Sequence, residues 1–297
     1  MRTVARIWFD GMDLLGEPHA ILKSIGCGPD VANIDDAPVL GRLHIHVILD
    51  EKDERLPKLL ALLKDHGADW RLSRSDRFTE AEIEAAPLLI MSYGIDDSVF
   101  GGPRMGTTYD MSNACERCGA GARQTSAMII DGQDLHHLEG RRAAATPYDD
   151  MLVDEKLAHV LAESGATGIS FRGVFAAFEK RGRIQLPWRQ LCAAHTMPPM
   201  SPRSTAIMPY NPCSCGRTGF DTPRDIPVRL VYRASDLADI RDVNVTWEWF
   251  GDTRYEGDVS DALFASPRFL VTPKVRRIFL GAGATGFHWR PIHLVDG

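Results

Sequence analysis

The sequence predicts an α+β protein with a small N-terminal α+β domain over residues 1–100 and a second domain over residues 105–297. Three observations predict this division. Strand and helix patterns are mixed in the first hundred residues, two tight cysteine pairs occur in the second part, and that part contains an internal repeat. A chain of 297 residues, 44% hydrophobic and 25% charged, is long enough for one large or two medium domains.

The N-terminal part contains several short segments with clear periodicity. In the clearest helix, over residues 54–66, Leu56, Leu59 and Leu63 follow the spacing of one helical face, and Gly67 ends the segment. Other elements are predicted as strands at residues 3–9, 42–50 and 88–92, as a capped helix at 79–85, and as a glycine-rich loop or linker at 94–106. No catalytic motif is recognised in this part of the chain.

Four of the six cysteines form two pairs, and each pair is followed by a glycine. Residues 115–119 read Cys-Glu-Arg-Cys-Gly, and residues 213–216 read Cys-Ser-Cys-Gly. Two cysteines on one tight turn supply half of a tetrahedral thiolate site, and glycine permits the turn. We therefore expect Cys115, Cys118, Cys213 and Cys215 to bind one structural zinc ion, with no position left for water.

Two features of this motif leave alternatives open. The second pair has one intervening residue instead of two, and 95 residues separate Cys118 from Cys213. The cysteines could instead be reduced surface thiols, two pairs that meet only as a disulfide, or a mixed site that recruits His195.

An internal repeat occupies much of the second part. Residues 152–174 match residues 270–292 without a gap at an offset of 118, and both copies contain Gly-Ala-Thr-Gly. Each copy reads as a helix, a tight turn at Gly165 or Gly283, and a strand. The predicted apolar helix faces consist of Leu157, Val160 and Leu161 in the first copy and Val275, Ile278 and Phe279 in the second.

A cysteine pair precedes each copy of the repeat. The simplest architecture is therefore a duplicated module of cysteine knuckle, strands, helix and strand. Two such modules, related by a pseudo-two-fold axis, would bring both pairs to one metal ion in spite of the long sequence separation.

Other chemistry-bearing residues give weaker predictions. His44 and His46 share one face of a predicted strand, which suits solvent-facing side chains better than a metal site without a carboxylate partner. On a helix, Cys192 and His195 would share one face, but a catalytic dyad also needs an orienting group and an oxyanion site. Cys27 reads as a buried free thiol.

The bulk properties restrict the class of protein. The formal net charge is −6, which disfavours a broad nucleic-acid-binding surface. The first residues lack the apolar run of a signal peptide, and no segment approaches the roughly 18 apolar residues of a membrane helix. We expect a cytoplasmic protein with no membrane association.

The motifs resemble those of a known family. Tyr109-Asp110, the pair closed by Gly119 and the second glycine-closed pair are similar to the double-CXXCG motif proteins of myxobacteria, some of which are immunity proteins for swarming-inhibition toxins. The C-terminal segment 285–292 also resembles the end of immunity proteins from polymorphic toxin systems. The resemblance covers residues 105–297 and implies a cytoplasmic protein that binds and neutralises a cognate toxin.

This resemblance implies a binding protein without chemistry of its own, whose acidic balance suits a basic toxin. The alternatives are an enzyme with an interdomain site of unknown chemistry, drawing on His44, His46, His195 and Arg290, and a zinc-containing regulatory or nucleic-acid-binding module. The candidate anchor aromatics for a partner are Trp247, Trp249 and Tyr255. The identity of the toxin and the oligomeric state do not follow from the sequence.

Overall fold

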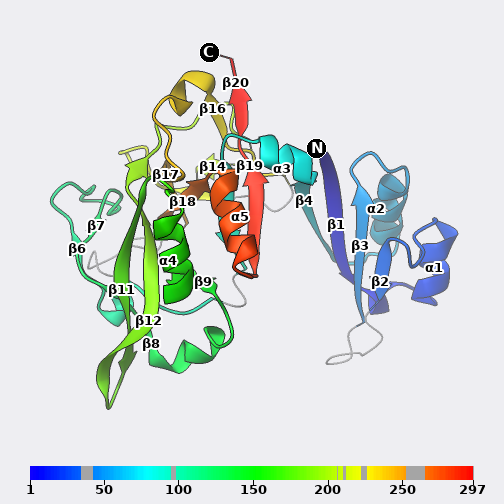
Figure 1. The fold of residues 1–297 in the computed structure, drawn as a ribbon. Coiled ribbons are helices and arrows are strands. Elements are labelled where there is room, and N and C mark those ends of the chain that lie inside the picture. Colours follow the sequence, from blue (N-terminus) through cyan, green and yellow to red (C-terminus); the bar gives the residue numbers. More distant parts are fainter. Residues whose placement is uncertain are drawn as a thin grey trace. The chain divides into compact units, whose positions relative to one another are not determined.

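The computed structural model confirms the α+β class and divides the chain into two compact units (Figure 1). Unit 1 contains Met1–Thr79 and Thr222–Val228, and unit 2 contains Glu80–Asp221 and Arg229–Gly297. The structure describes residues 1–34, 43–94, 98–205, 207–209, 212–221, 226–251 and 265–296.

Unit 1 has the element order β-α-β-β-α-β, which is the ferredoxin-like arrangement. Its elements are β1 (Arg2–Asp10), a 3-10 turn (Gly11–Asp13), α1 (Pro18–Ser24), β2 (Ala32–Ile34), β3 (His44–Asp50), α2 (Arg55–Asp65) and β4 (Trp70–Arg77). The sheet has the strand order β2-β3-β1-β4, and every neighbouring pair is antiparallel. Both helices pack on one face of this sheet.

The core of unit 1 follows from the alternation of its strands. Ile7 on β1 and Val47 on β3 are fully buried and lie opposite each other in the register. They pack with Leu59 and Leu63, which come from one face of α2. The helix predicted at residues 54–66 is therefore confirmed, and its leucines supply much of this core.

The boundary near residue 100 needs correction, because the chain divides at Thr79. The strand predicted at 88–92 exists as β5 (Leu89–Tyr93), but it pairs with two strands from the C-terminal end of the chain. The predicted linker at 94–106 also belongs to unit 2 in its described part. Val99 is fully buried, and its amide donates to the carbonyl of Ala145.

The first large sheet of unit 2 has the strand order β8-β11-β12-β10-β9. These strands and their helical connections are β8 (Met128–Asp131), a 3-10 helix (Gly132–His137), β9 (Ala143–Ala145), β10 (Met151–Asp154), α4 (Glu155–Glu163), β11 (Ile169–Phe178) and β12 (Gly182–Ala193). The long hairpin of β11 and β12 extends beyond the rest of the sheet in Figure 1.

The second large sheet has the order β14-β15-β17-β18-β5-β19, with β13 also paired to β17. Its strands and helices are α3 (Glu80–Ala85), β13 (His195–Thr196), β14 (Met208–Pro209), β15 (Phe220–Asp221), β17 (Val243–Phe250), β18 (Ser266–Val271), α5 (Pro273–Gly281) and β19 (Phe287–Pro291). Smaller pairs join β16 (Val231–Arg233) to β20 (His293–Val295) and β6 (Tyr109–Asp110) to β7 (Arg123–Gln124).

The two copies of the sequence repeat have the same local structure, as predicted. Each consists of the end of a strand, a helix, a turn and a second strand: β10-α4-β11 in the first copy and β18-α5-β19 in the second. In both copies, a third strand lies between the two strands and pairs antiparallel with each of them. This strand is β12, between β10 and β11, in the first copy and β5, between β18 and β19, in the second. The strand before each copy, β9 or β17, pairs antiparallel with its first strand.

The equivalence extends beyond the matched sequence. A short strand followed by a 3-10 helix precedes each copy, and that strand pairs parallel with the end of the copy, as β8 with β11 and β16 with β20. Asp134-Leu135 and Asp236-Leu237 occupy equivalent positions in the two 3-10 helices. The sequence match between residues 152–174 and 270–292 does not include these segments.

Helices α4 and α5 lie against each other between the two large sheets. Leu157 and Leu161 are buried in α4, as are Val275 and Phe279 in α5. The predicted apolar face of the first copy needs one correction, because the Val160 side chain is 47% exposed. Ala158 in α4 and Arg276 in α5, which occupy equivalent positions in the two copies, are also buried.

Candidate metal centre

The two cysteine pairs lie in two loops, each of which closes a short antiparallel strand pair. Cys115 and Cys118 lie between β6 and β7, and Cys213 and Cys215 lie between β14 and β15. All four belong to unit 2. The strand pairs therefore fix the ends of both loops.

Each cysteine loop is a tight turn that a glycine closes. The amide of Gly119 donates to the carbonyl of Cys115 at 2.8 Å, and the amide of Gly216 donates to that of Cys213 at 3.0 Å. Both glycines have left-handed φ values of 71° and 74°, which side chains disfavour. The second turn is one residue shorter, and this accommodates the unusual Cys-Ser-Cys spacing.

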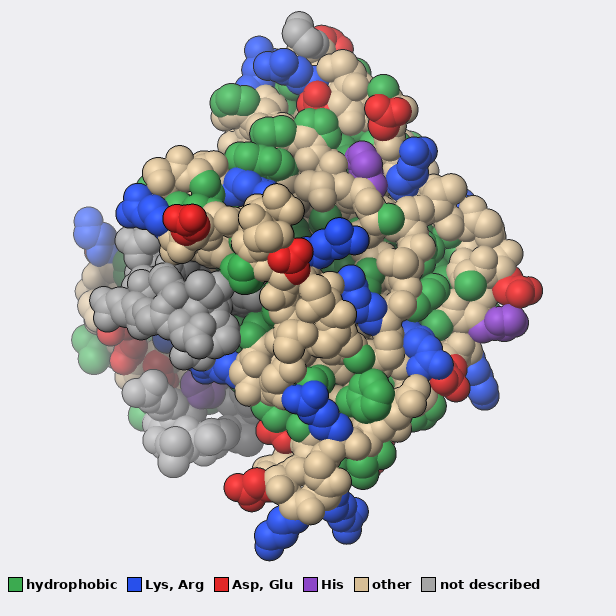
Figure 2. Space-filling model, turned by 90° about the vertical axis from the view of Figure 1, so that its left-hand side faces the viewer, with side chains coloured by type: hydrophobic (Ala, Val, Ile, Leu, Met, Phe, Trp, Pro, Cys, Tyr) green, Lys and Arg blue, Asp and Glu red, His purple; other side chains and the backbone are tan. Residues whose placement is uncertain are grey.

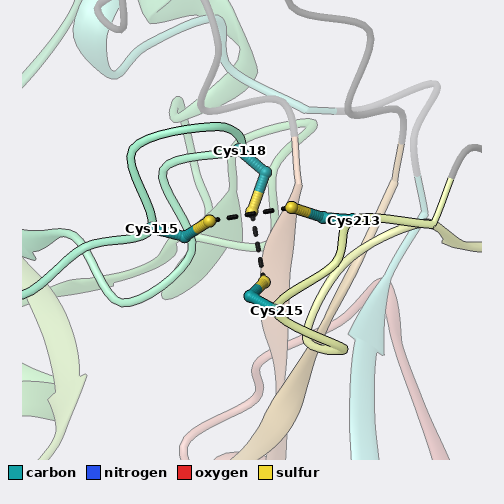
Figure 3. A group of neighbouring side chains, drawn as sticks. All are labelled: Cys115, Cys118, Cys213 and Cys215. Carbon is teal, nitrogen blue, oxygen red and sulfur yellow. Dashed lines mark hydrogen bonds between the residues drawn. The ribbon is translucent and has the colours of Figure 1, made fainter.

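The four sulfur atoms converge on one point (Figure 3). The ligand atoms all lie within 4.8 Å of one another, and the Sγ–Sγ distances of Cys115 to Cys213 and of Cys118 to Cys215 are both 3.6 Å. Four thiolates at about 2.3 Å from a tetrahedral zinc ion would lie about 3.8 Å apart. These distances fit the edges of such a tetrahedron, and they exceed the length of about 2.05 Å that a disulfide bond requires.

The protein around the sulfur atoms suits thiolate ligands. Backbone amides two residues further on donate to three of the thiols, an interaction that favours the thiolate: those of Ala120 to Cys118, of Cys215 to Cys213, and of Arg217 to Cys215. At Cys215 burial outweighs this interaction and raises the pKa of the thiol. Burial raises the pKa of Cys118 to about 12. Burial also acts to raise the pKa of Cys213, but the Cys215 amide and the neighbouring thiols lower it to about 7.

An apolar shell and polar contacts between the loops complete the centre. Trp249, Ala120 and Ala265 pack around the buried thiol of Cys118. The guanidinium of Arg117 in the first loop donates to the hydroxyl of Ser214 in the second at 3.2 Å. The four cysteines can therefore hold a metal ion in a site that supplies four sulfur ligands and excludes much of the solvent.

Thr218 is a residue of this centre that the sequence did not indicate. Its side chain is 1% exposed, and its Oγ1 has no well-aligned hydrogen-bond partner. The hydroxyl nevertheless lies close enough to Cys118 to lower the pKa of that thiol. Groups that donate to metal ligands orient those ligands and increase metal affinity. We infer that the Thr218 hydroxyl orients the Cys118 thiolate by donating a hydrogen bond to it.

We predict that Thr218→Val weakens metal affinity by about 10- to 100-fold, whereas Thr218→Ser retains it. Valine preserves the shape of threonine but removes the donor. Competition with a chromophoric chelator measures the affinity, and urea unfolding of the metal-free proteins provides the control. Equal affinities for the wild type and the valine variant would contradict the role assigned to the hydroxyl.

The other predicted site residues lie elsewhere. Cys192 is on β12 and His195 on β13, so the two residues do not lie on a helix, on which their spacing would have given them a shared face. The Cys192 thiol accepts from Arg172 at 3.1 Å, and Nδ1 of His195 lies 2.8 Å from Oδ1 of Asn244. These contacts give no support to a dyad, and among the described residues the metal-ligating cluster does not include His195.

His44 and His46 of unit 1 are placed as the alternation predicted. His46 is on the sheet face opposite α2 and stacks on Trp8 with ring centroids 4.9 Å apart. His44 is exposed on the same face. Within the part of the chain that the structure describes, neither histidine joins a cluster that could hold a metal ion.

The proposed anchor aromatics have structural roles where they are described. Trp249 is buried beside the cysteine centre. Trp247 is half-buried, and the Arg217 guanidinium lies 5.2 Å from its ring centroid and donates from Nε to its carbonyl. Tyr255 lies outside the described residues. An exposed aromatic anchor in unit 2 is therefore not supported by either tryptophan.

A second polar cluster in unit 2 contains the carboxyl of Asp150. Its Oδ1 accepts from Gln190 Nε2 at 3.1 Å, and its Oδ2 accepts from Thr146 Oγ1 at 3.0 Å. The adjacent Asp149 has a left-handed φ of 61° and pairs with Arg268 on β18. Both oxygens of Asp150 accept hydrogen bonds from other side chains of the protein. We therefore interpret this cluster as one that stabilises the turn between β9 and β10.

Burial raises the pKa of Asp150 to about 6 from an ordinary value of 3.8. Between these values the folded state binds more protons than the unfolded state, so this group's contribution to stability falls as the pH rises. We predict that Asp150→Asn gains up to about 3 kcal/mol relative to the wild type between pH 4 and pH 7.5. Urea unfolding at both pH values measures this difference, and a pH-independent difference would contradict it.

No protein-family model and no curated protein sequence matches this chain. In the described part of the chain, no helix has both the length and the apolar character that a membrane span requires. The site geometry and the motifs in the sequence therefore carry the functional interpretation.

Proposed function

We propose that this chain is an immunity-type binding protein that neutralises a cognate protein toxin in the cytoplasm and contains a structural zinc ion. The observation that carries the proposal is the convergence of both glycine-closed cysteine pairs on one centre. These pairs are the motif on which the resemblance to the double-CXXCG proteins rests. Four cysteine ligands complete a zinc tetrahedron, so a metal held there would have a structural role.

The equivalent surroundings of the two pairs support a duplicated module over residues 105–297. Each pair closes a short strand pair, and each is followed by a strand, a 3-10 helix, two strands, a helix and a further strand. We propose that two copies of this module share one zinc ion. When bound, zinc would hold loops more than 90 residues apart in sequence at a fixed distance and contribute to folding free energy.

The surface in Figure 2 supports a protein partner over a nucleic acid. On this face of the molecule, over β6, β7, β11 and β12, Lys and Arg side chains are scattered among hydrophobic and acidic ones. Nucleic-acid-binding surfaces instead gather basic side chains into a patch or stripe. The formal net charge of −6 agrees with this reading.

Co-expression with the polypeptide encoded by the adjacent gene tests the proposed function. We expect that polypeptide alone to arrest growth and the wild-type chain to restore it, with a stoichiometric complex in size-exclusion chromatography. Co-expression of that polypeptide with an empty vector in place of this chain is the negative control. Failure of the wild type to bind or protect, together with turnover of a small molecule, would instead assign the protein to the enzymes.

A further inference from the structure

Unit 1 exposes apolar side chains on the loop that follows β1. Leu15 is 83% exposed and Met12 is 66% exposed, which are the highest values among the large hydrophobic side chains that the structure describes. Trp70, 38% exposed, starts β4 opposite Phe9 and so lies at the same end of the sheet. Adjacent exposed apolar side chains of this size often mark a surface that binds another molecule.

Hydrogen bonds hold this loop in one conformation. Oδ1 of Asp10 accepts from the amides of Met12 and Leu43, both at 3.0 Å. The amide of Leu15 donates to Nδ1 of His66 at 3.0 Å, and the side chain of Leu14 is buried in the core. Met12 and Leu15 are therefore presented by fixed backbone, which reduces the entropy lost when a partner binds.

The surroundings of these side chains are acidic. Residues 11–17 and 64–70 together contain four exposed carboxylates and one lysine, Lys64, so their formal charge is −3. The four exposed acidic residues are Asp13, Glu17, Asp65 and Asp69. The amide of Asp69 donates to Oδ2 of Asp13 at 3.4 Å, so the two segments meet. The result is an apolar centre with a negatively charged rim.

We propose that Met12, Leu15 and Trp70 are the anchors of a docking surface for a basic protein. This inference rests on the proposed function, under which the basic partner is the toxin. Tryptophan and methionine are enriched at protein interfaces, and apolar anchors within a polar rim are typical of binding hot spots. The rim repels phosphate groups and anionic lipids, and a second copy in a two-fold dimer would place like charges opposite each other.

The anchors are tested by binding measurements with the purified polypeptide encoded by the adjacent gene. We expect the double variant Met12→Ser/Leu15→Asp to bind at least about 100-fold more weakly than the wild type. The matched control is Leu280→Asp, which changes an equally apolar side chain, 48% exposed on α5, and should alter affinity by less than about threefold. Unchanged thermal midpoints of both variants show that they remain folded.

The rim is tested by association kinetics. Glu17→Gln/Asp65→Asn should slow association by about tenfold at low salt and leave the dissociation rate nearly unchanged. If the wild type neither binds nor protects, the proposed function and this inference both fail. If the wild type binds and the anchor variant binds equally well, or if the anchors instead mediate self-association, the docking surface is wrong while the proposed function stands.

Discussion

Cys118→Ser is expected to release the metal ion and to destabilise the protein by about 4 kcal/mol or more. A ligand whose concentration is a thousand times its dissociation constant stabilises the folded state by about this amount. Structural zinc sites bind zinc more tightly than this and therefore stabilise by more. Cys118 is the most buried of the four ligands, at 3% exposure, and its loss leaves three sulfur atoms around the centre. Elemental analysis should give one zinc per wild-type chain, and thermal unfolding should give a lower midpoint for the variant.

Cys192→Ser is the matched control for this experiment. Cys192 is also a free cysteine of unit 2, but it lies outside the four-cysteine cluster. A serine hydroxyl there can still accept from Arg172, so metal content should be unchanged. A wild-type protein purified without chelator that contains no metal would contradict the zinc site, as would a Cys118→Ser variant with full metal content.

Phe279→Ala should lower the free energy of unfolding by about 3–5 kcal/mol. The side chain is fully buried on α5, with its ring centroid 5.1 Å from that of Phe287 and 5.7 Å from that of Trp289. Its removal therefore loses apolar burial and leaves a cavity between the helix and the second large sheet. Urea unfolding measures the difference.

Two further variants make this prediction specific. Leu161→Ala, at the equivalent position of α4 in the first copy, should also cost about 2–5 kcal/mol, because Leu161 is fully buried. The adjacent Leu280 is 48% exposed, and Leu280→Ala should change stability by less than about 0.5 kcal/mol. Equal effects at Phe279 and Leu280 would mean that α5 does not bury the face described here.

The sequence by itself determined the local elements of this protein. Apolar spacing over residues 54–66 was enough to predict α2, because a helical face is read from neighbours three and four residues apart. The repeat predicted helix, turn and strand in both copies, since capping residues and glycines act locally. The grouping of the four cysteines, which the structure brings together, could also be predicted, because each pair occupies one tight turn of the kind that binds metal ions.

Tertiary structure decided which distant segments meet. The sequence showed β5 as a buried strand but could not show that β18 and β19 are its partners, because strand pairing has no local signature. The same holds for Thr218, which the fold brings to Cys118 from a distant part of the sequence. Exposure was also decided by packing: Trp249 is buried, while Met12 and Leu15 stay in solvent. Burial depends on what the rest of the chain places around a side chain, and that information is spread over the whole sequence.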